Sequence, residues 1–303
     1  MTSDTTEDEI RQRSRLEWKA AAPGWKKYEK ELLASMTPVS DQLIRSAGIT
    51  FGNMVLDVAT GAGEPALTIA KVVGPAGRVT GVDLSPEMLQ IAKQRAASQD
   101  IMNVEFRAIE DETLSMFQDN IFDSVVCRNG LMLMPDPVKA LKAFLRVLKP
   151  GGKASVTVWG SPEKAPVISA VMKAVFKHVP DMQQPSPGTP GGPFSIPNID
   201  MLHSYFLQAG FSDFSATTTE ATGVETNTVE EFWQGTTEVV GFLVILLSRL
   251  PEEKKQAIKS DVIQSLRNIF PSGGPVKFTG ELILGTGTKT PSISKKSSRS
   301  PQL

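Results

Sequence analysis

The stretch that most constrains the fold is VLDVATGAGEPALTIA at residues 55–70. It opens with a short apolar run that predicts a buried parallel strand. The run leads into a turn that contains Gly61 and Gly63, after which apolar residues recur at helical spacing. Glycines in such a turn let the backbone pass close to a ligand that any side chain would push away. The stretch therefore predicts a strand, a glycine turn and a helix that together bind a nucleotide-like cofactor.

Two classes of cofactor are compatible with this glycine turn. Gly61, Gly63 and Ala66 fit the dinucleotide pattern G-x-G-x-x-G/A, and Asp83 follows Gly63 by about 20 residues, as that pattern requires. Asp57 favours a different cofactor, because its carboxylate would repel a pyrophosphate and attract an ammonium or a sulfonium. A structural role, in which Asp57 only caps the glycine turn, is the alternative.

Strand and helix patterns alternate through the first half of the chain. Short apolar or alternating runs predict further strands near residues 78–83, 103–107, 122–127 and 154–158. One of the intervening helices has a capped start, where a serine precedes a proline at residues 85–86. Such alternation argues for right-handed βαβ units and a doubly wound, mostly parallel α/β sheet.

The two ends of the chain follow other patterns. Residues 1–9 are expected to be disordered, and residues 10–34 predict helix that is interrupted at Pro23 and Gly24. After Trp159, helical segments surround a loop rich in proline and glycine. We expect four parts: an N-terminal lid segment (1–37), a cofactor-binding core (38–160), a helical cap with the last strands of the sheet (161–289) and a disordered tail (290–303).

Composition and charge exclude several functions. The 303 residues carry a formal net charge of −1, which gives a nucleic-acid partner no electrostatic support. The single cysteine, Cys127, excludes a disulfide framework and a multi-cysteine metal site, and we predict no metal. The acidic start has no secretory or transit pattern, and the apolar run at residues 239–247 is too short for a membrane span. We therefore expect a cytoplasmic protein without an integral membrane segment.

Four motifs in one order resemble those of a known family. VLDVATGAGEPA, GVDLSPEML, FDSVVCRNGLMLMPD and LKPGGKASVTVW are similar to successive motifs of class I S-adenosylmethionine-dependent methyltransferases. Within that family the chain most resembles the ubiquinone/menaquinone-biosynthesis C-methyltransferases and their small-molecule relatives. We expect a seven-stranded Rossmann-like sheet with a helical cap and N-terminal lid helices, in which Trp18, Trp25 and Tyr28 cover either the cofactor or the main core. The resemblance implies that the last strand, near residues 278–284, is antiparallel to the others.

The resemblance implies S-adenosyl-L-methionine as the cofactor and assigns residues to its parts. The methionine moiety is expected to contact the turn and the end of the fourth strand, through Asp57, Thr60, Gly61, Gly63, Cys127, Arg128 and Asn129. Asp83 is expected to accept hydrogen bonds from the ribose hydroxyls, with Leu84 and Met88 on either side of the adenine. The acid that holds the adenine amino group is Glu110 or Asp111, with Glu110 preferred.

The acceptor is expected to be a small, lipophilic molecule. The cap contains aromatic residues that are expected either to line its pocket or to form the cap's own core: Phe176, Phe194, Tyr205, Phe206, Phe232, Trp233 and Phe242. Leu131, Met132 and Met134 follow the fourth strand, near the expected methyl group. His178 and His203 are expected to have structural or surface roles, so no catalytic residue is predicted.

Two alternative functions accompany methyl transfer. A nicotinamide-dependent oxidoreductase is disfavoured by Asp57 and by the later motifs. A cofactor-binding protein without methyl-transfer activity is compatible with every motif. The sequence does not specify the acceptor, the atom that is methylated or the oligomeric state.

Overall fold

The computed structural model describes residues 6–182, 185–272 and 275–291. The first half of the described chain runs through α1 (Glu7–Lys27), α2 (Glu29–Ser46), β1 (Met54–Val58), α3 (Ala66–Val73), β2 (Arg78–Asp83), α4 (Pro86–Ser98), β3 (Val104–Ala108) and β4 (Phe122–Arg128). It continues through the short helix η1 (Leu131–Leu133), α5 (Pro137–Val147), β5 (Leu148–Trp159), η2 (Pro162–Lys164), α6 (Pro166–His178) and α7 (Ile199–Ala209). The last elements are β6 (Ser212–Thr226), α8 (Val229–Val239), α9 (Gly241–Arg249), α10 (Glu252–Ile269) and β7 (Val276–Thr288).

Seven strands of the described residues form a single sheet in the order β3-β2-β1-β4-β5-β7-β6. Strands β1 to β5 pair in parallel, whereas β7 is antiparallel to both β5 and β6. The predicted doubly wound, mostly parallel sheet is therefore confirmed, as is the antiparallel last strand. The strand order reverses between β1 and β4, and open α/β sheets bind their ligands at the carboxyl ends of strands that meet at such a point.

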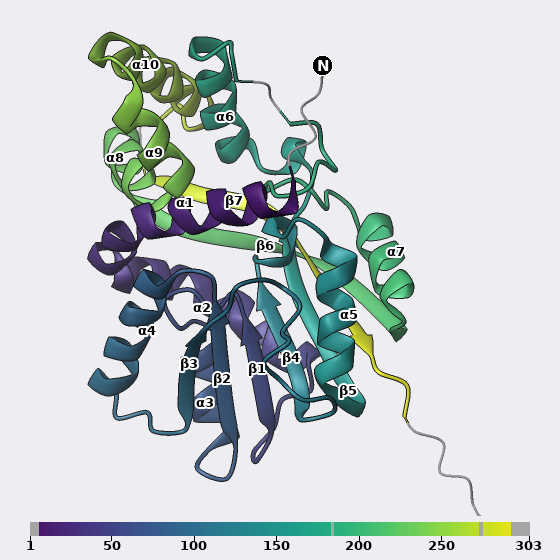
Figure 1. Cartoon of the computed structure of the whole chain (residues 1–303). Coiled ribbons are helices and arrows are strands. Elements are labelled where there is room, and N and C mark those ends of the chain that lie inside the picture. The colour runs from purple at the N-terminus through teal and green to yellow at the C-terminus, as the bar shows by residue number, and fades with distance from the viewer. Residues whose placement is uncertain (1–5, 183–184, 273–274, 292–303) are drawn as a thin grey trace, which may run out of the picture.

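Helices cover both faces of this sheet (Figure 1). On one face, apolar residues of α2, α3 and α4 pack against the strands, with Leu43, Leu67 and Leu89 among the buried residues. On the other face, α5 and α7 contribute Phe144 and Phe206 to the larger core cluster. The capped start predicted for α4 is confirmed, since Ser85 Oγ accepts a hydrogen bond from the backbone N–H of Met88 at 3.3 Å.

The cap is built from α6, α8, α9 and α10, which have a core of their own. Val175, Trp233, Ile258 and Leu266 are buried in this cluster. Helix α7 does not belong to it, because the buried ring of Phe206 packs in the main core. The cap thus lies beyond the carboxyl ends of the strands, on one side of the cavity described below (Figure 1).

Helix α1 corrects two expectations about the N-terminus. It begins at Glu7, within the segment expected to be disordered, and it continues through Pro23 to Lys27 without the expected interruption. Thr6 and Glu9 form a capping box, in which Thr6 Oγ1 accepts from Glu9 N at 3.2 Å and Glu9 Oε2 accepts from Thr6 N at 2.8 Å. Residues 1–5 lie outside the described part of the chain.

Two glycines let the backbone of α1 pack directly against the backbone of the cap helices. A Cβ on Gly24 of α1 would lie 2.1 Å from the carbonyl oxygen of Glu238 in α8. A Cβ on Gly241 at the start of α9 would lie 2.0 Å from the carbonyl oxygen of Glu17 in α1. The indole of Trp25 adds a hydrogen bond from Nε1 to the carbonyl of Val239 at 3.0 Å. Helix α1 therefore packs closely on α8 through Gly24 and on α9 through Gly241.

No helix among the described residues combines the length and the apolar character that a membrane crossing needs. The expected disordered tail at residues 290–303 lies outside the described residues from residue 292 onward.

Candidate cofactor and acceptor site

A cavity of about 1360 Å³ lies at the carboxyl ends of β1, β2 and β4. One side, the cofactor wall, consists of cavity-lining residues between Val58 and Gly130. The opposite side, the cap wall, consists of cavity-lining residues of α6, α8, α9, β6 and β7. Residues of α1 and α2 also line the cavity, and α1 crosses between the sheet and the cap (Figure 1). The site thus coincides with the reversal of strand order.

The glycine turn places its backbone at the cavity. Gly61 has a φ of +55° and lines the cavity, whereas Gly63, with a φ of +91°, does not. A Cβ on Gly63 would lie 3.0 Å from the Cβ of Ala92, so this glycine allows α4 to pack close to the turn. Thr60 lines the cavity and ties the turn to β2, through a hydrogen bond from its N–H to the carbonyl of Val82 at 3.0 Å.

Asp57 lies beneath the turn and outside the cavity wall. Its Oδ2 accepts hydrogen bonds from Thr60 Oγ1 at 2.6 Å and from the N–H of Ala66 at 3.1 Å. The side chain is fully buried, and this burial raises the pKa of its carboxyl to about 7. These contacts match the alternative in which Asp57 caps the glycine turn, and a contact with the cofactor stays a prediction.

Asp83 lines the cavity at the end of β2, with its carboxylate already held in place. Oδ2 accepts the N–H of Gly61 at 2.8 Å, and Oδ1 accepts the N–H of Ser85 at 2.9 Å. Burial raises the pKa of this carboxyl, and the backbone hydrogen bonds oppose that shift. A carboxylate has about four lone-pair sites, so both oxygens can still accept hydrogen bonds from a vicinal diol.

Beside Asp83 the wall becomes apolar, through Leu84, Met88 and Ile109. The next loop carries three consecutive acidic residues, at positions 110–112, and their side chains have different surroundings. Glu110, the preferred candidate, is exposed and pairs with Arg15 at 3.2 Å, while Asp111 lines the cavity. Asp111 Oδ1 accepts hydrogen bonds from Thr113 N at 2.8 Å and Oγ1 at 2.5 Å, and Asp111 is the better placed of the two candidates.

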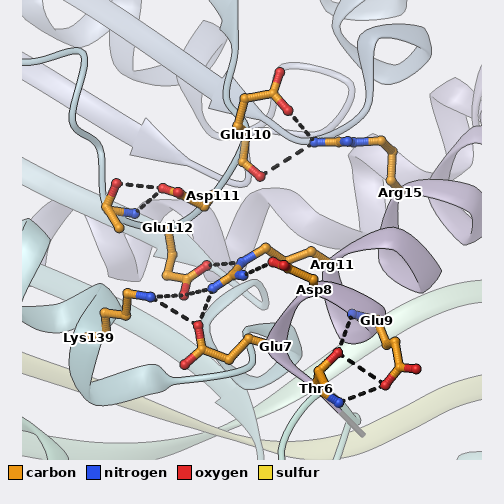
Figure 2. A network of polar contacts seen from close by, with 11 residues as sticks. Thr6, Glu7, Asp8, Glu9, Arg11, Arg15, Glu110, Asp111, Glu112 and Lys139 are labelled. Atoms are coloured by element: carbon orange, nitrogen blue, oxygen red, sulfur yellow. Dashed lines mark hydrogen bonds and ion pairs between the residues drawn. The ribbon is translucent and has the colours of Figure 1, made fainter.

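The third acid of the loop, Glu112, anchors α1 to the core (Figure 2). Arg11 donates to it twice, from Nε to Oε2 at 2.9 Å and from Nη2 to Oε1 at 2.7 Å. Both side chains are nearly buried, and Glu112 is the main cause of the raised pKa of Arg11. Asp8, Glu7 and Lys139 complete the network. The order of residues in this loop gave no signal that could have singled out Glu112.

The end of β4 presents two of its three predicted residues to the cavity. Arg128 and Asn129 line it, and Asn129 is held by Thr157, whose Oγ1 donates to its Oδ1 at 2.7 Å. Cys127 is buried beneath Gly130 and does not reach the cavity. Burial raises the pKa of its thiol to about 12, so the thiol stays protonated at neutral pH. Its predicted cofactor contact remains untested.

Among the lining residues that the sequence analysis did not single out, two charged ones lie next to the glycine turn. Glu64 follows the glycine turn, and its side chain is buried with Oε2 accepting from Thr68 Oγ1 at 2.9 Å. Arg95 of α4 donates from Nη1 to the carbonyl of Ala62 and pairs with Glu29 at 3.1 Å. In the sequence both look like ordinary surface charges, Glu64 after a turn and Arg95 in a helix, so only the fold reveals that they are buried.

Most of the cap wall is apolar, and part of the expected aromatic set forms it. Phe176, Phe232 and Phe242 line the cavity, together with Met132 and Met134 below them. The others lie elsewhere: Tyr205, Phe206 and Leu131 pack in the main core, Trp233 packs in the cap core, and Phe194 is not among the lining residues. The wall is completed by aliphatic residues of the cap helices, including Ile168, Val171, Met172, Leu243, Ile245 and Leu246.

Neither histidine lines the cavity. His178 Nε2 lies 2.7 Å from Asp261 Oδ2, between α6 and α10, and the ring of His203 stacks on Phe214. Both positions agree with the structural roles expected for them.

Comparisons with known proteins agree with this geometry. A family model described as a methyltransferase domain matches residues 49–199. A demethylmenaquinone methyltransferase of Staphylococcus aureus (strain JH9) is 32% identical over 179 residues, covering 56% of this chain and 72% of that protein. The YcgJ protein of Bacillus subtilis has a similar structure, with a TM-score of 0.56 at 21% identity, covering 84% of this chain and 99% of that one. Phosphoethanolamine N-methyltransferase 2 of Haemonchus contortus, solved with S-adenosyl-L-methionine, gives a TM-score of 0.53 at 17% identity, covering 95% and 58% respectively.

The sheet, the glycine turn and these similarities define a class I S-adenosylmethionine-dependent methyltransferase. The chain belongs to this family, and it transfers the methyl group of S-adenosyl-L-methionine. The cavity fits that cofactor, because Asp83 offers acceptors for a ribose diol next to an apolar slot at Leu84 and Met88. The sulfonium supplies an electrophilic methyl group, so the protein has to bind, orient and exclude water.

Proposed function

We propose that the acceptor is a lipophilic small molecule, such as a quinone, a polyketide or a terpenoid. The observation that carries this proposal is the cavity itself. Its volume of about 1360 Å³ exceeds the roughly 300–1,000 Å³ of an ordinary small-molecule site, which leaves space for a second ligand beside the cofactor. The cap wall that would face this second ligand is mostly apolar. A nucleotide or a peptide would leave its polar groups unpaired against such a wall.

We further propose that α1 acts as a lid over the cofactor. Trp18, Trp25 and Tyr28 all line the cavity, and the two indoles meet edge to face at 5.7 Å. The tryptophans pack on Ala62 of the glycine turn and on Met88 of α4. A helix in this place can exclude water from the methyl group while the acceptor approaches it, which favours displacement at a distance of about 3–3.5 Å.

A methyl-transfer screen tests the acceptor class. The full-length protein is incubated with S-adenosylmethionine labelled in its methyl group and with panels of quinones, polyketides, terpenoids, RNA, DNA and peptides. We expect label in an apolar small molecule and none in the macromolecules. Strong labelling of RNA, DNA or peptide without labelling of any lipophilic compound would overturn the proposal.

A further inference from the structure

Buried polar atoms without partners gather next to the glycine turn. Within the described residues, four buried side-chain atoms lack a hydrogen bond: Asp57 Oδ1, Glu64 Oε1, Arg95 Nε and Arg128 Nε. Arg95 Nε lies 3.1 Å from Glu29 Oε1, so an ion pair compensates this atom. The other three belong to Asp57, Glu64 and Arg128, and the charges of Glu64 and Arg128 both act on the pKa of Asp57. Protein interiors leave few such atoms, and a group of them indicates a partner outside the chain.

Two of these residues face the cavity in a fixed orientation. Glu64 is 6% exposed, and the hydrogen bond from Thr68 to Oε2 leaves Oε1 for another donor. Arg128 Nη2 donates to the backbone carbonyl of Glu64 at 2.9 Å, which leaves Nε for another acceptor. Within the described residues no ion pair joins the two side chains. Burial lowers the pKa of Arg128, and the Glu64 charge opposes that shift. Asp57 lies behind them and does not line the cavity.

A carboxylate and a guanidinium side by side favour one kind of ligand. A phosphate would be attracted by Arg128 and repelled by Glu64, and a metal ion would be repelled by Arg128. An α-amino acid carries an ammonium and a carboxylate on one carbon, so it satisfies both residues at once. The ammonium donates to a carboxylate, and a guanidinium donates to a carboxylate in a charge-assisted contact.

We propose that Glu64 and Arg128 form a two-charge clamp for the amino-acid end of the cofactor, in which Glu64 binds the ammonium and Arg128 binds the carboxylate. Asp57 then holds the glycine turn through its hydrogen bonds, and its charge offsets part of the charge of Arg128. Met88 and Asp83 lie farther along the cofactor wall, where the adenosine end is expected. The clamp concerns the cofactor alone and does not depend on the acceptor proposed above.

Calorimetry with two ligands tests the role of Glu64. S-adenosylhomocysteine carries the amino-acid group, whereas 5′-methylthioadenosine keeps the adenosine and lacks that group. In Glu64→Gln we expect the affinity for S-adenosylhomocysteine to fall about 10- to 100-fold and the affinity for methylthioadenosine to stay within twofold. Glu253→Gln changes an exposed acid of α10 outside the cavity wall and should leave both affinities unchanged.

A second pair of ligands tests Arg128. Decarboxylated S-adenosylmethionine lacks the carboxylate, so the wild type should bind it about tenfold more weakly than S-adenosylmethionine. In Arg128→Gln the two should bind alike. If this variant does not fold, Arg128→Lys keeps the charge without the planar fork and should reduce the preference partly.

Three outcomes would overturn the clamp. Unchanged binding of S-adenosylhomocysteine in Glu64→Gln would mean that Glu64 does not contact the cofactor. An equal loss for S-adenosylhomocysteine and methylthioadenosine would assign Glu64 to the framework of the turn. A preserved preference for the carboxylated ligand in a folded Arg128 variant would place the carboxylate elsewhere.

Discussion

The two walls of the cavity differ in the kind of groups that form them. The cofactor wall is formed by backbone turns and by polar side chains with fixed partners, such as Asp83 with its two backbone N–H donors. The cap wall is formed mainly by apolar side chains from helices that are separate in sequence, such as α6 and α9. Polar contacts select a ligand through defined positions of donors and acceptors, whereas apolar contacts select it mainly through shape. The cofactor wall is therefore specific for one cofactor, whereas the cap wall selects an acceptor mainly by its shape.

The largest expected effect lies on the cofactor wall. Asp83→Asn removes the charge from both hydrogen bonds expected to the ribose, which should cost about 2–3 kcal/mol, or roughly 30- to 150-fold in affinity. Titration calorimetry with S-adenosylhomocysteine measures this loss. An unchanged affinity in the folded variant would place the ribose elsewhere and would weaken the comparison between the walls.

A smaller effect is expected where α1 meets the cap. Gly24→Ala places a methyl group against the carbonyl of Glu238, and overpacking of this kind costs about 1–3 kcal/mol. Gly235→Ala in α8 is the matched control, because its Cβ would meet nothing within 4 Å and alanine favours a helix by about 0.5–1 kcal/mol. Urea unfolding should therefore show opposite signs for the two variants. The same sign in both variants would mean that the contact between α1 and the cap accommodates the added methyl group without strain.

The cap wall should respond in the opposite way to the cofactor wall. Phe176→Ala removes an aromatic ring from the cavity lining, so the KM for the identified acceptor should rise about tenfold while the affinity for S-adenosylhomocysteine stays constant. Leu207→Ala alters an exposed leucine outside the cavity and should change neither value. A loss of cofactor affinity in Phe176→Ala would show that the two walls are not independent.

The smallest effect, measured between pH 6 and 8, concerns the ionisation of Asp57. The pKa of Asp57 is raised from 3.8 to about 7 in the folded protein, so the folded state binds this proton more tightly than the unfolded chain does. The stability that it contributes is fully present below about pH 4 and is lost as the pH rises to about 7, and roughly 1 kcal/mol of this loss falls between pH 6 and 8. Asp57→Asn cannot ionise and should lose this slope in urea unfolding. Parallel pH profiles for wild type and variant would contradict the raised pKa.

The sequence predicts the cofactor wall far better than the cap wall. The strand, glycine turn and helix at residues 55–70 are local patterns, and Asp83 is found because it ends the strand that pairs with β1. The acidic loop was harder, since three consecutive acids give no local reason why Glu110 should be exposed and Glu112 buried.

Tertiary packing decides the features that the sequence left open. The apolar face of α7 is clear from its periodicity, yet periodicity does not tell whether Phe206 packs on the sheet or within the cap. Glu64 escaped notice because a charged residue after a turn is usually solvated, and its burial depends on contacts with Thr68 in the following helix and with Arg128 at the end of β4. Pro23 suggested a break in α1, whereas the packing of neighbouring tryptophans on α4 favours a continuous helix.

The ion pair between Arg11 and Glu112 has a thermodynamic consequence for the binding of the two ligands. The same loop lines the expected adenine region through Asp111 and holds α1 through Glu112. When two events act on one loop, each changes the free energy of the other by the same amount. An acceptor that holds α1 against this loop would increase the affinity for the cofactor, and a bound cofactor would in turn increase the affinity for the acceptor by the same factor. This reciprocity would make the two ligands bind cooperatively, whichever of them binds first.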